Sequence, residues 1–270
     1  MEPSTRLHQH AVHAVASRRN SPPLRALRRI ARSYLDLDGN RSFVPELNGE
    51  ARLLRVLASY GAGCLFDVGA NVGNWTRMAL RLVPGAGVHA FELVPDTAAQ
   101  LMRSLSGHSS VVVNALGLDR KDGEVQVRYF PTFSEGSSVT GTNVDLPFEW
   151  RTARVTTGDA YCAKCGIDRI DFVKLDVEGA EDRVLDGFAE TLRAGRIGAV
   201  QFEYGVPNID SHYLLADFHR RFAKLGYRIG KLFPNHVDFR PYDRTIDEDF
   251  RGPNYVAVRQ DLRGLIASLQ

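Results

Sequence analysis

The chain has 270 residues, 44% of them hydrophobic, which is enough to bury the core of one large domain with extensions. Its formal net charge is +2, so the whole chain lacks the strongly basic character of a nucleic-acid binder. No apolar run approaches the ~18 residues of a membrane-spanning helix, and no secretory leader opens the chain, so we expect a cytoplasmic protein. The basic residues are mostly Arg, which is typical of a bacterial source.

Residues 1–42 form a basic extension, and we expect the main domain to occupy residues 43–270. The first 33 residues carry seven Arg and one acid, Glu2. We expect the segment before Pro22 to be partly disordered and its three His not to bind a metal. Apolar residues then recur at helical spacing, with Arg on the other faces: Leu24, Leu27, Ile30, Ala31, Tyr34 and Leu35. This amphipathic helix, over residues 22–35, suits peripheral contact with an anionic membrane or a partner; packing on the main domain is the equal alternative.

The main domain begins with alternating helix and strand patterns. We predict a helix over 46–59, then strands over 64–68, 87–92 and 110–115, with helices over 73–82 and 95–106 between them. Such alternation indicates parallel strands with helices on both faces. Residues 119–158 interrupt it with half-exposed strand patterns, which predict an antiparallel insertion. The Ser-rich loop within residues 130–150 is a candidate lid.

The alternation resumes after the insertion. We predict strands over 170–176, 197–203, 227–233 and 254–259, with helices over 180–193 and 211–225. The fold class is therefore α/β and Rossmann-like. It has a mostly parallel seven-stranded sheet, helices on both faces and an antiparallel insertion after the third strand.

The turn after the first strand has the pattern D-x-G-x-N-x-G, from Asp67 through Gly69 and Asn71 to Gly73. A dinucleotide-binding turn needs G-x-G-x-x-G, and Asn71 stands where its second Gly would be. The turn therefore favours a nucleoside ligand without phosphates, such as S-adenosylmethionine (SAM). Glu92 ends the second strand, nineteen residues after Gly73, where an acid can accept hydrogen bonds from ribose hydroxyls.

A second polar group follows the strand over 170–176. Lys174 and Asp176 point to the same face of that strand, and a buried Lys needs a carboxylate partner such as Asp176 or Glu178. Glu178 and Glu181 are expected in the first turn of the next helix, where acids are favoured. Glu203 ends the neighbouring strand, so Asp176 and Glu203 are expected to converge over the ligand crevice.

Two roles are open for Asp176 and Glu203. Either acid could orient or deprotonate a substrate hydroxyl. Together they could bind Mg²⁺, which is less favoured because no third ligand is evident, and we assign no metal ligands. His212 and His219, expected on the helix over 211–225, are possible bases but fit packing or surface roles better.

The three Cys residues do not indicate a metal or disulfide site. Cys64 lies in an apolar strand and is expected to be a small core residue. Cys162 and Cys165 have the spacing of half a zinc site, but two further ligands are missing. We therefore expect them to be a surface loop pair in a reducing compartment.

Four segments together resemble the FkbM family of SAM-dependent methyltransferases. They are DVGANVG at 67–73, FELVP at 91–95, ALGLD at 115–119, and KLDVEGAE at 174–181 followed by VLDG at 184–187. The match covers residues 60 to 205 and implies the class I methyltransferase fold. It departs from the family's F-E-P-x-P at Leu93, but Glu92 and Pro95 are kept. The resemblance implies that Asp67, Gly69, Asn71 and Gly73 line the methionine end of SAM, that Glu92 takes the ribose, and that Ala115 and Leu116 flank the adenine.

The resemblance implies SAM-dependent O-methylation of a hydroxyl on a sugar, glycolipid or polyketide. The acceptor would be a small molecule or a lipid-linked glycan. Lys174, Asp176, Glu178 and Glu203 are the candidates that position or activate it. Two other functions stay open: a nicotinamide-dependent oxidoreductase, which the missing glycine and the lack of a Tyr-x-x-x-Lys pair argue against, and a non-catalytic adaptor that keeps the fold and docks at a membrane.

Overall fold

The structure, a computed structural model, describes residues 3–131 and 146–270. The chain divides into two compact units, Met1–Arg41 and Ser42–Gln270. The first unit contains helices α1 (Pro3–Ser17) and α2 (Pro22–Asp38). The segment before Pro22 was expected to be partly disordered, but it forms helix α1 instead. It has no Gly and contains several Ala, which favours a helix.

The second unit is built on an eight-stranded sheet with the order β10-β9-β11-β8-β7-β1-β2-β3. The strands are β1 (Cys64–Val68), β2 (Gly87–Phe91), β3 (Val111–Asn114), β7 (Ile170–Leu175), β8 (Ile197–Gly205), β9 (Tyr227–Leu232), β10 (Val237–Asp238) and β11 (Arg251–Arg259). From β3 to β8 the neighbouring strands are parallel, and β11 is antiparallel to both β8 and β9. This confirms the Rossmann-like α/β class. The predicted count of seven strands was one short, because β10 has only two residues and shows no periodicity.

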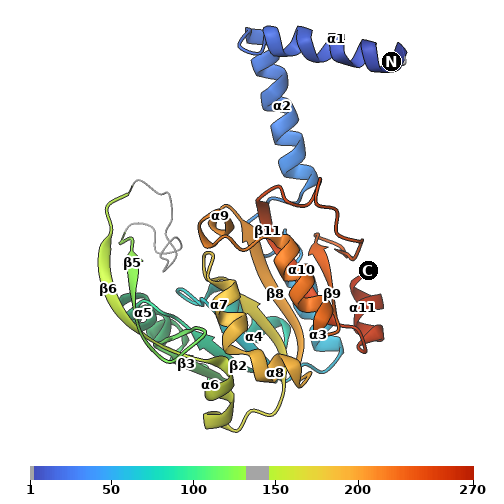
Figure 1. Ribbon diagram of the computed structural model, residues 1–270. Coiled ribbons are helices and arrows are strands. Elements are labelled where there is room, and N and C mark those ends of the chain that lie inside the picture. Colours follow the sequence, from blue (N-terminus) through green and yellow to red (C-terminus); the bar gives the residue numbers. More distant parts are fainter. Residues whose placement is uncertain (1–2, 132–145) are drawn as a thin grey trace. The chain divides into compact units, whose positions relative to one another are not determined.

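Helices cover both faces of this sheet (Figure 1). One face packs against α6 (Gly158–Cys165), α7 (Glu181–Gly187), α8 (Ala189–Arg193) and α10 (Leu215–Lys224). The other packs against α3 (Glu50–Ser59), α4 (Asn74–Leu82) and α11 (Arg263–Leu269). Helix α5 (Pro95–Leu105) packs against β3, and α9 (Pro207–Ser211) follows β8. The strongly apolar β1 is buried between the two layers, as parallel strands require.

A small second sheet follows β3, with the order β4-β6-β5 (Figure 1). Its strands are β4 (Gly117–Leu118), β5 (Gly123–Tyr129) and β6 (Glu149–Thr156). Strands β5 and β6 pair antiparallel, which confirms the predicted insertion, while β4 pairs parallel to β6. The candidate lid lies mostly at residues 132–145, outside the described residues.

Several element predictions were wrong in detail, and the helix predicted over 46–59 begins only at Glu50. The helix over 180–193 is broken into α7 and α8 at Phe188, whose buried ring packs on Phe66. Helix α10 begins at Leu215 because the Asp217 side chain accepts the Leu214 N–H at 3.0 Å; His212 therefore lies outside it. Cys162 and Cys165 lie on helix α6 rather than in a loop, and Cys162 is buried.

Candidate active site

The carboxyl ends of β1, β2, β7 and β8 surround a cavity of about 580 Å³. This volume is within the range of small-molecule sites, and ligands of open α/β sheets bind at this edge. Among the residues chosen from sequence, the following line it: Asp67, Gly69, Asn71, Glu92, Lys174, Asp176, Glu178 and Glu203. Segments more than a hundred residues apart are thus brought to one place.

The turn after β1 needs its unusual backbone. Gly69 has a φ of 88° and Asn71 a φ of 48°, both in the left-handed region. A Cβ atom on Gly69 would collide with the carbonyl oxygen of Asp176, so only a hydrogen atom fits there. The N–H of Asp176 donates to the carbonyl of Val68 at 2.9 Å, which holds the same two loops together. Gly69 therefore allows the loop after β1 to touch the loop after β7.

Glu92 directly follows β2, and backbone N–H groups hold both oxygens of its carboxylate. The Asn71 N–H donates to Oε2 and the Val94 N–H donates to Oε1, each at 2.8 Å. The side chain is only 7% exposed, and this burial raises the pKa of Glu92 to about 7. Each oxygen keeps a further lone pair. The carboxylate can therefore accept hydrogen bonds from two adjacent hydroxyls of a ligand.

Asp67, at the end of β1, is fully buried in the cavity wall. Its Oδ2 accepts a hydrogen bond from the Thr76 hydroxyl at 2.6 Å, whereas its Oδ1 has no hydrogen-bond partner among the described residues. Burial raises the pKa of Asp67, although Lys174 opposes the shift. A buried acceptor without a donor is uncommon and is suited to a ligand that brings one.

Lys174 is the cation nearest to these acids. Its Nζ lies 2.6 Å from Oδ2 of Asp176 and 4.0 Å from Oδ1 of Asp67. Burial disfavours the ammonium, but the two carboxylates outweigh it, so the pKa of Lys174 is raised. Nζ also lies 5.9 Å from the centre of the Trp75 ring, whose Nε1 has no partner among the described residues. Of the two partners considered from sequence, Asp176 is the one that Lys174 contacts.

Glu178 and Glu203 complete the acidic side of the cavity. Glu178 has a φ of 54° and lies in the loop before α7, so its predicted place in the helix was wrong. Glu181 starts α7 but is buried and accepts the N–H groups of Val177 and Gly179, each at 3.3 Å. Burial and the charges of Asp176 and Glu178 raise the pKa of Glu203 well above its usual value. Glu203 and Asp176 both line the cavity, so they do converge there.

A polar network that the sequence did not predict lies beside Glu203. Nε2 of Gln201 donates to Oε1 of Glu50 at 2.7 Å and to Oδ1 of Asn254 at 3.0 Å. Nδ2 of Asn48 donates to Oε2 of Glu50 at 2.9 Å. Asn48, Glu50 and Asn254 line the cavity. The available signal was Gln201, an amide inside an otherwise apolar strand that shares a face with Glu203.

The structure does not bring three of the expected residues to the cavity. Gly73, with a φ of 86°, caps the start of α4, and a Cβ there would meet Leu101 at 2.7 Å, so this glycine serves helix packing. Ala115 is exposed, and Leu116 packs against the core. Strand β3 ends early, at Asn114, and it is the next residues that line the cavity: Gly117, Leu118 and Asp119.

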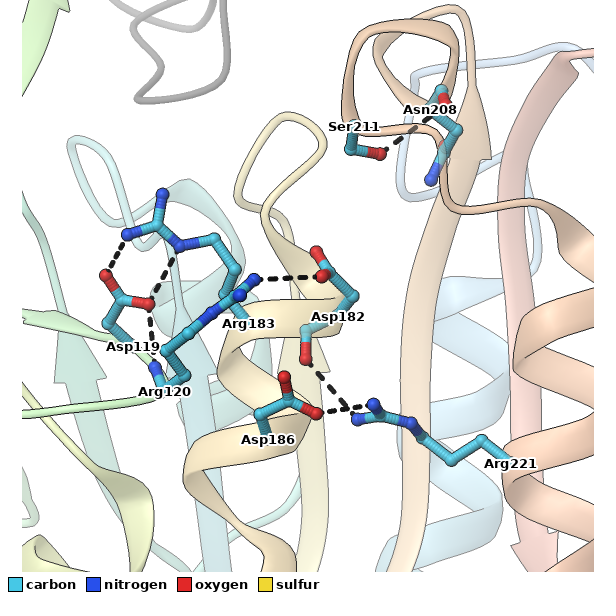
Figure 2. Close-up of polar contacts among 8 residues, drawn as sticks. All are labelled: Asp119, Arg120, Asp182, Arg183, Asp186, Asn208, Ser211 and Arg221. Carbon is cyan, nitrogen blue, oxygen red and sulfur yellow. Dashed lines mark hydrogen bonds and ion pairs between the residues drawn. The ribbon is translucent and has the colours of Figure 1, made fainter.

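Ion pairs connect helix α7 to its neighbours on two sides (Figure 2). Arg183 on α7 forms a two-pronged ion pair with Asp119, which follows β4; its Nε donates at 2.9 Å. On the other side, Arg221 of α10 pairs with Asp186 and donates to the Asp182 carbonyl at 3.3 Å. Because the loop that carries Asp176 and Glu178 leads into α7, these pairs fix that loop at the cavity.

Neither candidate His lines the cavity. His219 on α10 packs 5.0 Å from the Tyr242 ring, and burial lowers its pKa. Among residues 3–131 and 146–270, no group of three or more His, Cys, Asp or Glu is arranged to hold a metal ion.

The sheet and the cavity at its carboxyl edge are consistent with the Rossmann-like fold of class I methyltransferases. The family model of the methyltransferase FkbM domain matches residues 67–229, and the chain belongs to this family. The matched segment runs from Asp67 through the site to β9.

Two characterised proteins are similar to the chain at low identity. It is 28% identical over 192 residues to the hexuronic acid methyltransferase AglP of Haloferax volcanii, covering 70% of this chain and 75% of that one. It is 25% identical over 150 residues to the 2-O-methyltransferase NoeI of Sinorhizobium fredii, covering 49% and 60%. Among solved structures, methyltransferase FkbM from Methylobacillus flagellatus is similar with 15% identity and a TM-score of 0.48, over 73% of this chain and 43% of that one.

Proposed function

We propose that this protein transfers a methyl group from SAM to a hydroxyl group of a glycosyl acceptor. The observation that carries the proposal is the arrangement of Glu92 and Asp67 at the ends of neighbouring parallel strands. The family gives the reaction class, and these two acids support SAM as the donor. When bound, SAM supplies a methyl group activated by its positive sulfonium.

The residues present fit SAM. Glu92 can take the two ribose hydroxyls, because its carboxylate is already oriented by two backbone N–H groups. Asp67 offers a buried acceptor without a donor, which suits the ammonium of the methionine end. Gly69 and Asn71 keep the loop backbone close to that end of the cavity. The acidic lining also favours a cationic ligand over a phosphate-bearing dinucleotide.

The acceptor hydroxyl is proposed to lie over β7 and β8. Glu203 is the preferred base, because a carboxyl with a raised pKa binds a proton more strongly than an ordinary Glu. Lys174 holds Asp176 in place by a direct ion pair, and Asp176 and Glu178 orient the acceptor. Alignment of this kind contributes up to ~7–11 kcal/mol in well-oriented systems.

The charge of the cavity bears on the acceptor class. Its described lining contains two cations, and each already forms an ion pair with an acid of the protein. Lys174 pairs with Asp176, and Arg183 pairs with Asp119. Glu50 and Glu178 add negative charge at the acceptor side. A carboxylate on the acceptor would face these groups without a counterion. We therefore propose that the acceptor is a hydroxyl of a sugar without a carboxylate group. A lipid-linked glycan or a polyketide alcohol would be a variant of the same chemistry.

Neither alternative from the sequence gains support. The chain belongs to a methyltransferase family, which argues against a nicotinamide-dependent oxidoreductase. A non-catalytic adaptor that binds no ligand does not require buried, oriented acids at the cavity, so Asp67 and Glu92 argue against this role.

Calorimetry and a transfer assay test the proposal. The protein should bind SAM at micromolar concentration, and Glu92→Gln should weaken binding at least about tenfold, which is ~1.4 kcal/mol. Glu124→Gln, an exposed change on β5, is the matched control and should bind normally. Transfer from labelled SAM to a panel of glycosides and polyketide-type alcohols is then followed by mass spectrometry. Absence of SAM binding would refute the donor, and SAM binding without any transfer to hydroxyls would refute the acceptor class.

A further inference from the structure

Helix α2 has one apolar side and one basic side. At 100° per residue, Leu27, Ile30 and Tyr34 share one side of the helix, which Leu24, Ala31 and Leu35 widen. The opposite side carries Arg25, Arg28, Arg29 and Arg32. Within the unit Met1–Arg41, no residue of α2 is buried. The separation of the two sides is complete from Leu24 to Leu35.

Within its own unit, the apolar side of α2 is exposed. Leu27 is 59% exposed, Tyr34 62% and Ile30 66%. A contiguous apolar surface of this kind, bordered by charge, marks an interaction site rather than a stable solvent-facing surface. No described helix is both long and apolar enough to cross a membrane. A helix with an apolar and a basic side suits a surface on which it lies flat.

The charges on α2 indicate which surface this is. Up to Leu35 the only charged residues of the helix are its four Arg, and the acids Asp36 and Asp38 come in its last turn. Two copies of α2 packed through their apolar sides would bring like charges together along both edges. A layer of anionic lipid headgroups over an apolar interior matches both sides at once, because Arg can extend its charge to the phosphates while its stem lies along apolar chains.

We propose that α2 docks this protein on an anionic lipid surface. The helix lies parallel to the membrane plane, with Leu27, Ile30 and Tyr34 at the headgroup–acyl boundary and the Arg residues at the phosphates. This interaction is separate from methyl transfer and does not depend on it.

Vesicle sedimentation of the full-length chain tests the proposal. Phosphatidylcholine vesicles with and without phosphatidylglycerol are compared at low and high salt. The key pair of variants is Ile30→Lys and Ser33→Lys, which have the same net charge but place the new Lys on the apolar side and on the polar side next to Arg29, respectively. Both positions are exposed, and circular dichroism checks that each variant keeps its helix content.

The expected result is binding to phosphatidylglycerol-containing vesicles only, weakened by salt. Ile30→Lys should lower the affinity at least about tenfold, from the loss of one buried apolar side chain, whereas Ser33→Lys should bind as well as the original chain or better. Absence of binding to anionic vesicles, or equal binding of the two variants, would overturn the proposal. It would also be overturned if light scattering showed that Ile30→Lys only dissociates a dimer and leaves vesicle binding unchanged.

Discussion

Lys174 in β7 and Asp176, directly after the strand, form an ion pair with Nζ 2.6 Å from Oδ2. The same ammonium lies 4.0 Å from the buried carboxylate of Asp67 at the end of β1. One cation thus neutralises acids from two adjacent strands at the cavity. A charged group in an apolar strand is tolerated here because its partners are built into the same sheet edge.

Loss of this cation should be strongly destabilising. Lys174→Met keeps the stem but leaves Asp67 and Asp176 without their counterion, so we expect the free energy of unfolding to fall by ~3–5 kcal/mol. Urea unfolding measures it. The control is Arg169→Met, which removes a surface pair with Asp171 and should cost less than ~1 kcal/mol. Equal losses in the two variants would show that Lys174 has no special electrostatic role.

Two glycines with nearly the same backbone provide a matched test of the loop contact. Gly69 and Gly85 have φ of 88° and 87°, but a Cβ on Gly69 would collide with the Asp176 carbonyl, whereas a Cβ on Gly85 would meet nothing within 4 Å. Gly85→Ala should cost only the backbone strain, ~1–2 kcal/mol. Gly69→Ala should cost clearly more and also abolish SAM binding. If thermal denaturation and calorimetry find the two variants alike, the proposed role of the close contact between the loops after β1 and β7 would be refuted.

The buried acids predict a pH dependence of stability without ligand. The pKa of Glu92 is raised from 4.5 to about 7, and so is that of Glu181, in both cases mainly by burial. Between these values the unfolded chain loses the protons while the folded chain keeps them, so the folded state is favoured at low pH. The contribution of both groups to stability is therefore full below pH 4.5 and is lost as the pH rises through about 7.

Substitution should reduce this dependence. Glu92→Gln and Glu181→Gln should each flatten the profile of unfolding free energy between pH 4.5 and about 7, whatever they do to its absolute value. The exposed control Glu124→Gln should leave the slope unchanged. Chemical unfolding across this range measures the slope. A slope that survives both buried substitutions would mean that these two carboxyls do not cause it.

The acidic lining predicts discrimination between acceptors and rests on the proposed function. In matched pairs such as a glucoside and the corresponding glucuronide, the uncharged member should have the higher kcat/KM by at least about tenfold. Glu203→Gln should lower transfer to both members of a pair, because it removes the proposed base. Preference for the glucuronide would refute the charge argument, and SAM binding with transfer to neither would refute the acceptor class instead.

Local patterns were sufficient where a segment's own residues decide its structure. Strand β1 has the predicted bounds, because its apolar run is short and is followed at once by a glycine turn. The positions of Glu92 and of the Lys174–Asp176 pair also followed from strand alternation and strand ends. Prediction failed where contacts are distant in sequence: a helix is divided at Phe188, which packs on Phe66, and the two-residue β10 pairs with β9.

The sequence by itself determined the α/β class, the turn from Asp67 to Gly73 and the acids at strand ends, because these depend on periodicity and on residues close in the chain. Only the tertiary structure decided which residues share the cavity. It brought Glu50 and Asn254 to Gln201, replaced Ala115 and Leu116 by Gly117 and Leu118, and assigned Gly73 to helix packing. Such contacts join segments that are distant in sequence, and the order and register of the strands fix them rather than any local preference.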